Sequence, residues 1–211
     1  AQIKLIMDVG LASISFFTAL ISIFLAAGSI CRQIEEKTIY TVLTKPVSRL
    51  SFVLGNFLGM IWVILVTLAL TGLTLFMLLY LKGHIMGETA WVALFFIFLE
   101  AALITSIALM FSSLSSSSAT STIFTFLIYL VGHFNPQLRF LGERWKETIG
   151  RWAIKIAGWI LPNLEGFNIR SKVVQGIPIS ANRIAISLAY AAIYICAMLI
   201  LSYLILERRE L

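Results

Sequence analysis

Charged residues are scarce in this chain, and their scarcity excludes an ordinary water-soluble domain. Of its 211 residues, only 12% are charged and 60% are hydrophobic, and the mean hydropathy is +0.97. Soluble globular domains carry about 25% charged residues. The net charge of +6 comes from basic residues that lie near the ends of hydrophobic runs, which suits lipid headgroups rather than nucleic acid. We therefore predict an all-α polytopic membrane protein with no nucleic-acid partner.

The chain also lacks the residue sets that carry catalysis or bind metal. It contains no GxxxxGK[ST] loop for ATP, no HExxH and no GxSxG. Asp8 is its single aspartate, and its two cysteines form no CxxC motif. The candidate metal ligands are His84, Met86 and His133, all expected on the outer side, and two distant histidines without a nearby cysteine make a poor site. We predict no catalytic residue, no metal and no cofactor in this chain.

Five apolar runs are long enough to cross a hydrocarbon core of about 30 Å at about 1.5 Å per residue. They are 9–30, 52–81, 90–111, 116–134 and 184–206. The region 135–183 differs, because charged residues alternate there with apolar residues at three- and four-residue steps, which is typical of an amphipathic helix. The apolar positions are Leu138, Leu141, Trp145, Ile149, Trp152, Ile156 and Ile160.

The segment 31–51 holds the densest early cluster of charge, between the first two apolar runs. Residues 35–44 contain no glycine or proline, and Ile39, Val42 and Leu43 lie close together on a helical wheel. Lys45 and Pro46 end the pattern, since the residue before proline is pushed out of the α region. The segment therefore predicts a short amphipathic helix at the membrane surface.

This segment also carries a family resemblance. An acidic pair, Thr-Ile-Tyr-Thr-Val-Leu at 38–43, Thr-Lys-Pro-Val-Ser-Arg at 44–49 and Phe-x-x-Gly-Asn-Phe-x-Gly at 52–59 resemble the permease subunits of ABC-2 type transporters. The most similar branch is the permease of multi-copper enzyme maturation systems. Asn56 departs from the family pattern, where a lysine follows the glycine. Weaker pieces follow in family order: Phe-Ser-Ser-Leu-Ser-Ser at 111–116, Tyr-Leu-Val-Gly-His at 129–133, Leu-Pro-Asn-Leu-Glu at 161–165 and Glu-Arg-Arg at 207–209.

The resemblance implies partners and a topology. It implies a cytoplasmic coupling helix that docks on a separate ABC ATPase subunit, which would hold ATP and Mg²⁺. It also implies a second copy of the permease or a related permease, a multi-pass location in the prokaryotic cytoplasmic membrane, re-entrant helices within 135–183, and a sixth span before Ala1, so that the chain is incomplete at its N-terminus. The residues that it assigns to ATPase coupling are Glu35, Glu36, Thr38, Ile39, Tyr40, Leu43, Lys45, Pro46 and Arg49.

Simpler interpretations of these coupling residues stay open. Glu35 and Glu36 could mark the solvated end of an interfacial helix, and Lys45, Pro46 and Arg49 could be ordinary anchors to lipid phosphates.

The topology follows from the number of spans between the loops, because each span moves the chain to the other side of the membrane. A cytoplasmic coupling segment puts the serine turn after residue 111 and the C-terminus in the cytoplasm, with 82–89 and 135–183 outside. The inner loops obey the positive-inside rule, whereas the basic outer region does not. In a competing topology the run 116–134 dips into the membrane and returns, which leaves 135–183 in the cytoplasm.

Glu100, near the middle of 90–111, is the one carboxylate inside an apolar run. A carboxylate at that depth costs a few kcal/mol, so it should face a cavity, a partner helix or a neighbouring subunit. We predict that Glu100 lies on the transport pathway or at the subunit interface; a hydrogen bond to a Ser, Thr or Tyr on an adjacent span is the alternative.

Gly55 and Gly59 form a small-xxx-small pair that could admit another helix at a subunit interface, unless they reflect only the abundance of glycine in membrane helices.

Taken together, these features predict the permease subunit of an ATP-driven transporter, and not an enzyme. Export is favoured, because nothing suggests docking of an external binding protein. The pathway is apolar apart from Glu100, which favours a lipid-like, amphipathic or hydrophobic-peptide cargo. A polytopic membrane enzyme using Glu100 is an alternative that needs a second polar group at the same depth, which the sequence does not show. An ion-coupled carrier is another, but such carriers usually contain inverted repeats, and none is detected.

Overall fold

The computed structural model describes residues 2–35, 48–83, 87–135, 137, 140 and 161–208. This part of the chain is helical and contains no strand. In order, its elements are α1 (Gln2–Ala27), α2 (Ser29–Glu35), α4 (Arg49–Leu81), α5 (Glu88–Leu114), α6 (Ser118–His133), the 3₁₀ turn η1 (Glu165–Phe167), α9 (Arg170–Gln175) and α10 (Ala181–Arg208).

Four of these helices are long and apolar enough to cross a membrane, which confirms the predicted all-α polytopic class. They are α1 together with most of α2, then α4, α5 and α10. The expected span at 116–134 corresponds to α6, which has only 16 residues. At about 1.5 Å per residue it covers about 24 Å, less than a hydrocarbon core of about 30 Å. The expected span at 116–134 is therefore only a partial one.

Helix α5 is the centre of the bundle, and α1, α4, α6 and α10 all pack against it. Of its most apolar stretch, 78% is buried, against 6% for α10. Alanines and serines, which let neighbouring helices approach closely in membranes, are frequent among its buried residues. Bulky side chains such as Phe96, Leu103 and Leu109 fill the space between these contacts.

The breaks between helices lie at residues that suit them: glycines that allow close packing or a positive φ, and a serine that caps a helix. At Gly28, between α1 and α2, a Cβ atom would lie 2.7 Å from Ser118 Oγ, so glycine lets α6 begin close beside this break without moving the Ser118 hydroxyl. Ser48 caps α4 by accepting a hydrogen bond from the Ser51 amide at 3.1 Å. Gly83, with φ of +72°, turns the chain after α4.

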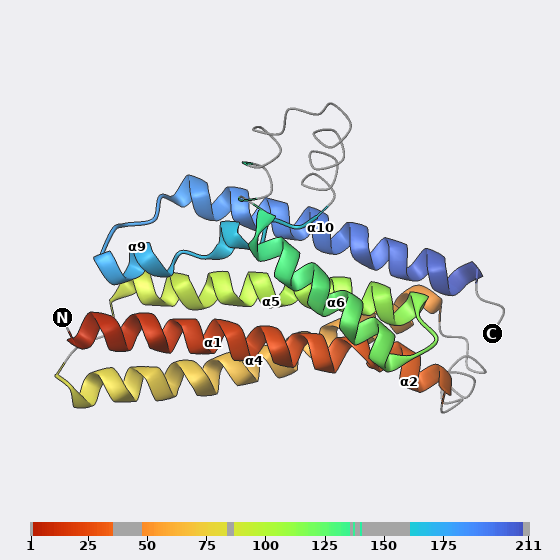
Figure 1. The fold of residues 1–211 in the computed structure, drawn as a ribbon, viewed down its shortest axis with the longest axis horizontal. Helices are drawn as coiled ribbons and strands as arrows, with labels where there is room; N and C mark the ends of the chain where they lie inside the picture. The colour runs from red at the N-terminus through yellow and green to blue at the C-terminus, as the bar shows by residue number, and fades with distance from the viewer. Residues whose placement is uncertain are drawn as a thin grey trace.

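Different loops and helix ends lie at the two ends of the bundle (Figure 1). The end of α2, the start of α4, the α5–α6 turn and the C-terminal end of α10 lie at one end. The N-terminus, the α4–α5 connection and α9 lie at the other. This grouping agrees with the parity that the sequence predicts, and we call the first group the coupling end. Which side of a membrane it faces stays a prediction.

The described part of 135–183 lies between the end of α6 and the end of the bundle opposite the coupling end. Helix α6 stops part-way along the bundle, and 161–169, η1 and α9 continue to the end opposite the coupling end (Figure 1). Leu164, Phe167, Ile169 and Val173 are buried in the core with residues of α1 and α5. The path agrees with the outward topology of the sequence and not with a return of the chain to the coupling end. The predicted amphipathic positions 138, 141, 145, 149, 152, 156 and 160 lie outside the described residues.

Candidate functional site

Glu100 is buried at the meeting point of three helices. Its side chain on α5 is 4% exposed, and each carboxylate oxygen faces a different neighbour. Glu100 Oε1 lies 3.4 Å from His133 Nε2 on α6. Glu100 Oε2 accepts a hydrogen bond from Ser15 Oγ on α1, also at 3.4 Å. Both distances exceed the usual hydrogen-bond length of about 2.7–3.0 Å, so the carboxylate is held loosely.

His133 determines how many protons the pair holds. Its Nδ1 lies 3.3 Å from the Tyr129 carbonyl oxygen. A carbonyl only accepts, so we assign the ring hydrogen to Nδ1, which leaves Nε2 facing Glu100. A bond between Nε2 and Glu100 Oε1 then needs one proton between them, on either atom. Glu100 Oε1 has no hydrogen-bond partner within the described structure. One proton on either atom would form that bond and leave the pair net neutral, which lowers the cost of a charge at this depth.

Close packing at Gly132 explains why His133 meets Glu100. A Cβ atom at Gly132 would lie 2.8 Å from Leu164 Cγ and 3.1 Å from the Pro162 carbonyl oxygen. The Leu164 amide donates to the Gly132 carbonyl at 3.2 Å, and Asn135 Nδ2 donates to the Leu161 carbonyl at 3.2 Å. The motifs at 129–133 and 161–165 are therefore in direct contact, and together they end α6 beside Glu100.

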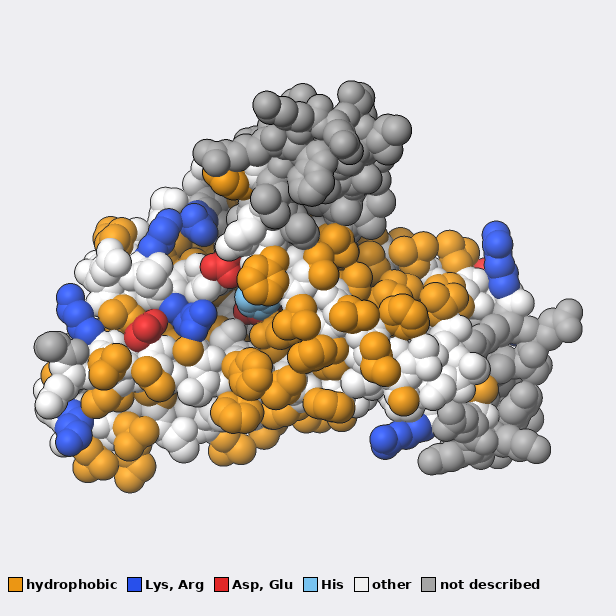
Figure 2. All heavy atoms as spheres, in the orientation of Figure 1, with side chains coloured by type: hydrophobic (Ala, Val, Ile, Leu, Met, Phe, Trp, Pro, Cys, Tyr) orange, Lys and Arg blue, Asp and Glu red, His pale blue; other side chains and the backbone are white. Residues whose placement is uncertain are grey.

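Further charged groups lie next to this pair. Asn168 Nδ2 donates to Glu165 Oε1 at 2.9 Å, and Arg170 Nε donates to Asn168 Oδ1 at 3.0 Å. Glu165 and Arg170 are near enough to Glu100 for their charges to act on it. Figure 2 shows charged side chains over the half of this face beyond the end of α6, and hydrophobic side chains over α6 itself. The polar region thus reaches from the end opposite the coupling end to Glu100.

Two expectations about His133 were wrong. It does not lie at the outer end of a span, and it is a second polar group at the depth of Glu100. Both errors come from the short length of α6, because its 16 residues leave His133 beside the middle of α5. The cluster is nevertheless unlike a catalytic triad: in a triad the histidine lies between nucleophile and acid, whereas here the acid Glu100 lies between Ser15 and His133.

At the coupling end, Arg49 connects the start of α4 to the end of α10. Arg49 Nη1 donates to the carbonyl oxygens of Leu206 and Glu207, both at 2.7 Å. These carbonyls belong to the last turn of α10, where a cation also meets the negative end of the helix dipole. Any displacement of Arg49 therefore acts directly on α10.

Helix α2, on the other side of the segment 36–47, is attached to α4 and α5. Gln33 Nε2 donates to Asn56 Oδ1 at 2.9 Å. Ser112 Oγ accepts from the amides of Ile30 and Cys31, both at 3.1 Å. These amides belong to the first turn of α2, which has no intrahelical acceptor for them. Asn56, the departure from the family pattern, thus has a structural role in attaching α2.

The serines of the turn between α5 and α6 have structural partners, so they pack neighbouring helices together. Besides the contact of Ser112 with α2, the Ser113 and Ser202 hydroxyls hydrogen-bond to each other and join α5 to α10. Ser115 Oγ accepts from the Ser117 amide within the turn.

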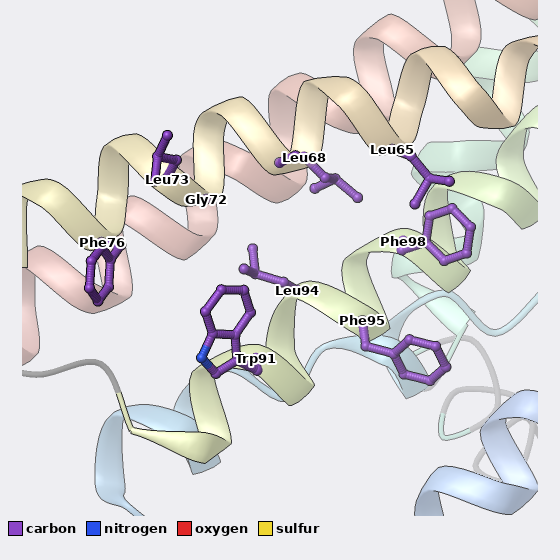
Figure 3. A pocket seen from close by; sticks show the side chains of 10 residues that line it. Leu65, Leu68, Gly72, Leu73, Phe76, Trp91, Leu94, Phe95 and Phe98 are labelled. Carbon is purple, nitrogen blue, oxygen red and sulfur yellow. The ribbon is translucent and has the colours of Figure 1, made fainter.

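Two grooves lie along α4. Gly55 and Gly59 line one of about 540 Å³, and a Cβ atom at either glycine would meet no described atom within 4 Å. The other, of about 660 Å³, lies between α4 and α5 and is lined by apolar side chains such as Leu68, Trp91 and Phe95, with Gly72 at its floor (Figure 3). The small-xxx-small pair is thus open to a further helix, and its role at a subunit interface stays a prediction.

A family comparison decides the class of the protein. The family described as ABC-2 family transporter protein matches residues 2–211, nearly the whole chain. The chain belongs to the ABC-2 transporter family. No curated protein matches it. The match does not extend to the branch linked to multi-copper enzymes, so that part of the resemblance stays a prediction.

ABC-2 permeases are multi-pass membrane components of transport systems that work with ABC ATPase subunits, as the sequence predicted. Of the residues assigned to ATPase contact in this ABC-2 protein, the structure describes the backbone of Glu35, which ends α2, and Arg49. The others lie outside the described residues: Glu36, Thr38, Ile39, Tyr40, Leu43, Lys45 and Pro46.

Several residues at these sites were missed by sequence reasoning. Ser112 lies inside the quoted motif 111–116, whereas Ser15 and Gln33 had no signal beyond being polar residues in or near apolar runs. Gly132 did have one, because it lies inside the quoted motif 129–133 next to a histidine.

Proposed function

We propose that this ABC-2 protein is the permease subunit of an ATP-driven exporter, and that a partner ATPase moves the segment 36–47. The observation that carries the proposal is how the two flanks of that segment are anchored. Arg49 holds the last turn of α10, whereas α2 is attached to α4 and α5 through Asn56 and Ser112. A force on the segment therefore reaches three helices.

The anchors also suggest a direction of movement. Helix α10 is the least buried of the long helices, so it has the fewest contacts to lose when it is displaced. Helix α5 is held on all sides, so it acts as the fixed element. We propose that ATP-driven displacement tilts α10 against α5 and changes access along the face that contains Glu100.

We further propose that two copies form the working permease in the prokaryotic cytoplasmic membrane, with the coupling end in the cytoplasm. The open groove at Gly55 and Gly59 supports a contact between copies, because small residues allow close approach of helices in lipid. Export is supported by the sequence, which offers no region resembling a docking site for an external binding protein.

Copurification tests the coupling role. Tagged permease is expected to retain an ABC ATPase subunit, identified by mass spectrometry, and the double change Glu35→Lys with Glu36→Lys is expected to lower its recovery. Lys82→Glu is the matched control, because it reverses a charge at the opposite end of the bundle. If deletion of 36–46 leaves ATPase recovery unchanged, the coupling role is wrong.

A proton-coupled carrier is a second candidate, favoured by the contact at 3.4 Å between two titratable side chains, Glu100 and His133, inside the bundle. In that case cargo uptake into reconstituted vesicles would follow a proton gradient and would persist without ATP hydrolysis. The exporter proposal expects the opposite dependence.

A further inference from the structure

A second polar pocket, separate from the Glu100 cluster, lies where α10 begins. It has a volume of about 450 Å³. Its lining includes two cations, Lys172 from α9 and Arg183 from the first turn of α10, and no acidic side chain among the described residues. Gly176, with φ of +74°, ends α9 and turns the chain back toward α10. That turn brings the two cations to one pocket.

Arg183 is incompletely paired within the described structure. Its Nη2 donates to the Gly166 carbonyl at 3.4 Å, a long contact. Its Nε is buried and has no hydrogen-bond partner among the described residues. A buried donor on a charged group is costly to leave unpaired, so an acceptor from outside the chain would satisfy it.

The remaining lining also offers hydrogen-bond donors. Ser180 and Ser187 contribute hydroxyl groups. Asn182 lies in the first turn of α10, where the amides of Arg183 and Ile184 already donate to the Ser180 carbonyl at 3.0 and 3.3 Å. Arg183 and Ser187 are four residues apart and so share one face of the helix. Two cations and two hydroxyls together match the charge and the acceptors of a phosphate group.

The location of the pocket indicates where that phosphate comes from. The pocket lies at the start of a helix long enough to cross the membrane, which is the level of the lipid headgroups. Ile186 forms its apolar edge, and Ile193 and Ile200 follow at seven-residue steps on the same stripe of α10. These three side chains are 61%, 72% and 54% exposed. The stripe continues from the pocket toward the membrane interior, as an acyl chain would.

We propose that this pocket binds the phosphate group of an anionic membrane phospholipid, whose acyl chain lies along Ile186, Ile193 and Ile200. Lys172 and Arg183 neutralise the phosphate, and Ser180 and Ser187 donate hydrogen bonds to it. Nothing in this proposal depends on ATP coupling, so it can fail or succeed independently of the proposed function.

Native mass spectrometry of the purified full-length chain tests the site. The probes are phosphatidylglycerol, phosphatidylcholine and inorganic phosphate, each titrated alone and in competition. Phosphatidylglycerol is expected to bind more tightly than phosphatidylcholine, whose ammonium group opposes the two cations. Lys172→Gln removes one charge-assisted contact and is expected to weaken phosphatidylglycerol binding at least about tenfold.

Two further variants keep the test independent of folding. Ser187→Leu fills the pocket without removing a charge and is expected to weaken binding similarly. Lys82→Gln removes a cation at the same end of the bundle but outside the pocket, and is expected to leave binding unchanged. Equal melting temperatures without added lipid establish that the variants fold.

The competition arm distinguishes the two sources of phosphate. If millimolar inorganic phosphate displaces phosphatidylglycerol from the wild type but binds Lys172→Gln weakly, the site is a phosphate site that also takes soluble anions. If Lys172→Gln and Ser187→Leu retain phosphatidylglycerol as tightly as the wild type, the pocket is not a lipid phosphate site and the proposal is overturned.

Discussion

Replacing His133 by alanine is the most direct test of the buried pair. The change leaves Glu100 Oε1 with no donor from α6, because His133 Nε2 is the neighbour it faces at 3.4 Å. Breaking a well-formed buried ion pair costs about 3–5 kcal/mol. The cost should be smaller here, because the contact is long and the His133 side chain is 27% exposed. We expect a loss of about 1–3 kcal/mol.

Glu100→Gln should behave differently if the pair shares one proton. Glutamine keeps the shape of the glutamic acid, and its amide can donate to His133 Nε2. We therefore expect a loss below about 1 kcal/mol for Glu100→Gln alone. Adding Glu100→Gln to His133→Ala should recover most of the lost stability, because the uncompensated carboxylate is then gone.

Thermal unfolding of the purified chain in detergent, followed by tryptophan fluorescence, measures these differences. At about 2–4 °C per kcal/mol for a chain of this size, His133→Ala should melt roughly 2–12 °C below the wild type. Ser15→Ala, which removes the other weak contact of Glu100, is the matched control and should cost less. The assignment fails if Glu100→Gln is as harmful as His133→Ala, or if the double variant shows no recovery.

Three further outcomes follow from contacts at the two ends of α6 and at the coupling end. Gly132→Ala should cost about 1–3 kcal/mol in the same melting assay, because its Cβ would meet Leu164; Gly59→Ala, with open space around it, should cost nothing, and equal losses would contradict the packing argument. Ser112→Ala should cost about 1–3 kcal/mol by leaving two α2 amides unpaired, with faster amide hydrogen exchange across α2; unchanged exchange would contradict it. Arg49→Gln should speed exchange in the last turn of α10 while other helices stay protected; uniform protection would show that the turn does not depend on this cation.

The long helices could be predicted from the sequence because run length alone decides whether a helix spans a membrane. Helices α4, α5 and α10 contain the predicted spans and extend them by a few residues at their ends. Run length could not predict the depth of α6. The predicted run and the helix end within one residue of each other, but packing of Gly132 against 162–164 places that end beside the middle of α5. That contact depends on residues about 30 positions away in sequence.

At the candidate sites, too, the sequence predicts some residues but not the partners that they contact. Glu100 stands out in the sequence because a carboxylate is rare in an apolar run, but its partner depends on where α6 stops. Arg49 was predicted at the coupling segment, whereas the carbonyl groups that it binds are backbone atoms of α10 with no sequence signature. Phosphate-binding residues such as Lys172 and Arg183 are ordinary interfacial cations until the turn at Gly176 brings them together.

The early end of α6 also affects the membrane around the protein. After residues 134–160, 161–169 is an extended stretch with a single 3₁₀ turn, η1, and its backbone is not fully hydrogen-bonded within a helix. Hydrocarbon cannot solvate such backbone, so acyl tails should withdraw from that flank in one leaflet only. Water, lipid headgroups or protein must therefore surround this backbone, which distinguishes that half of the flank from the half that α6 covers.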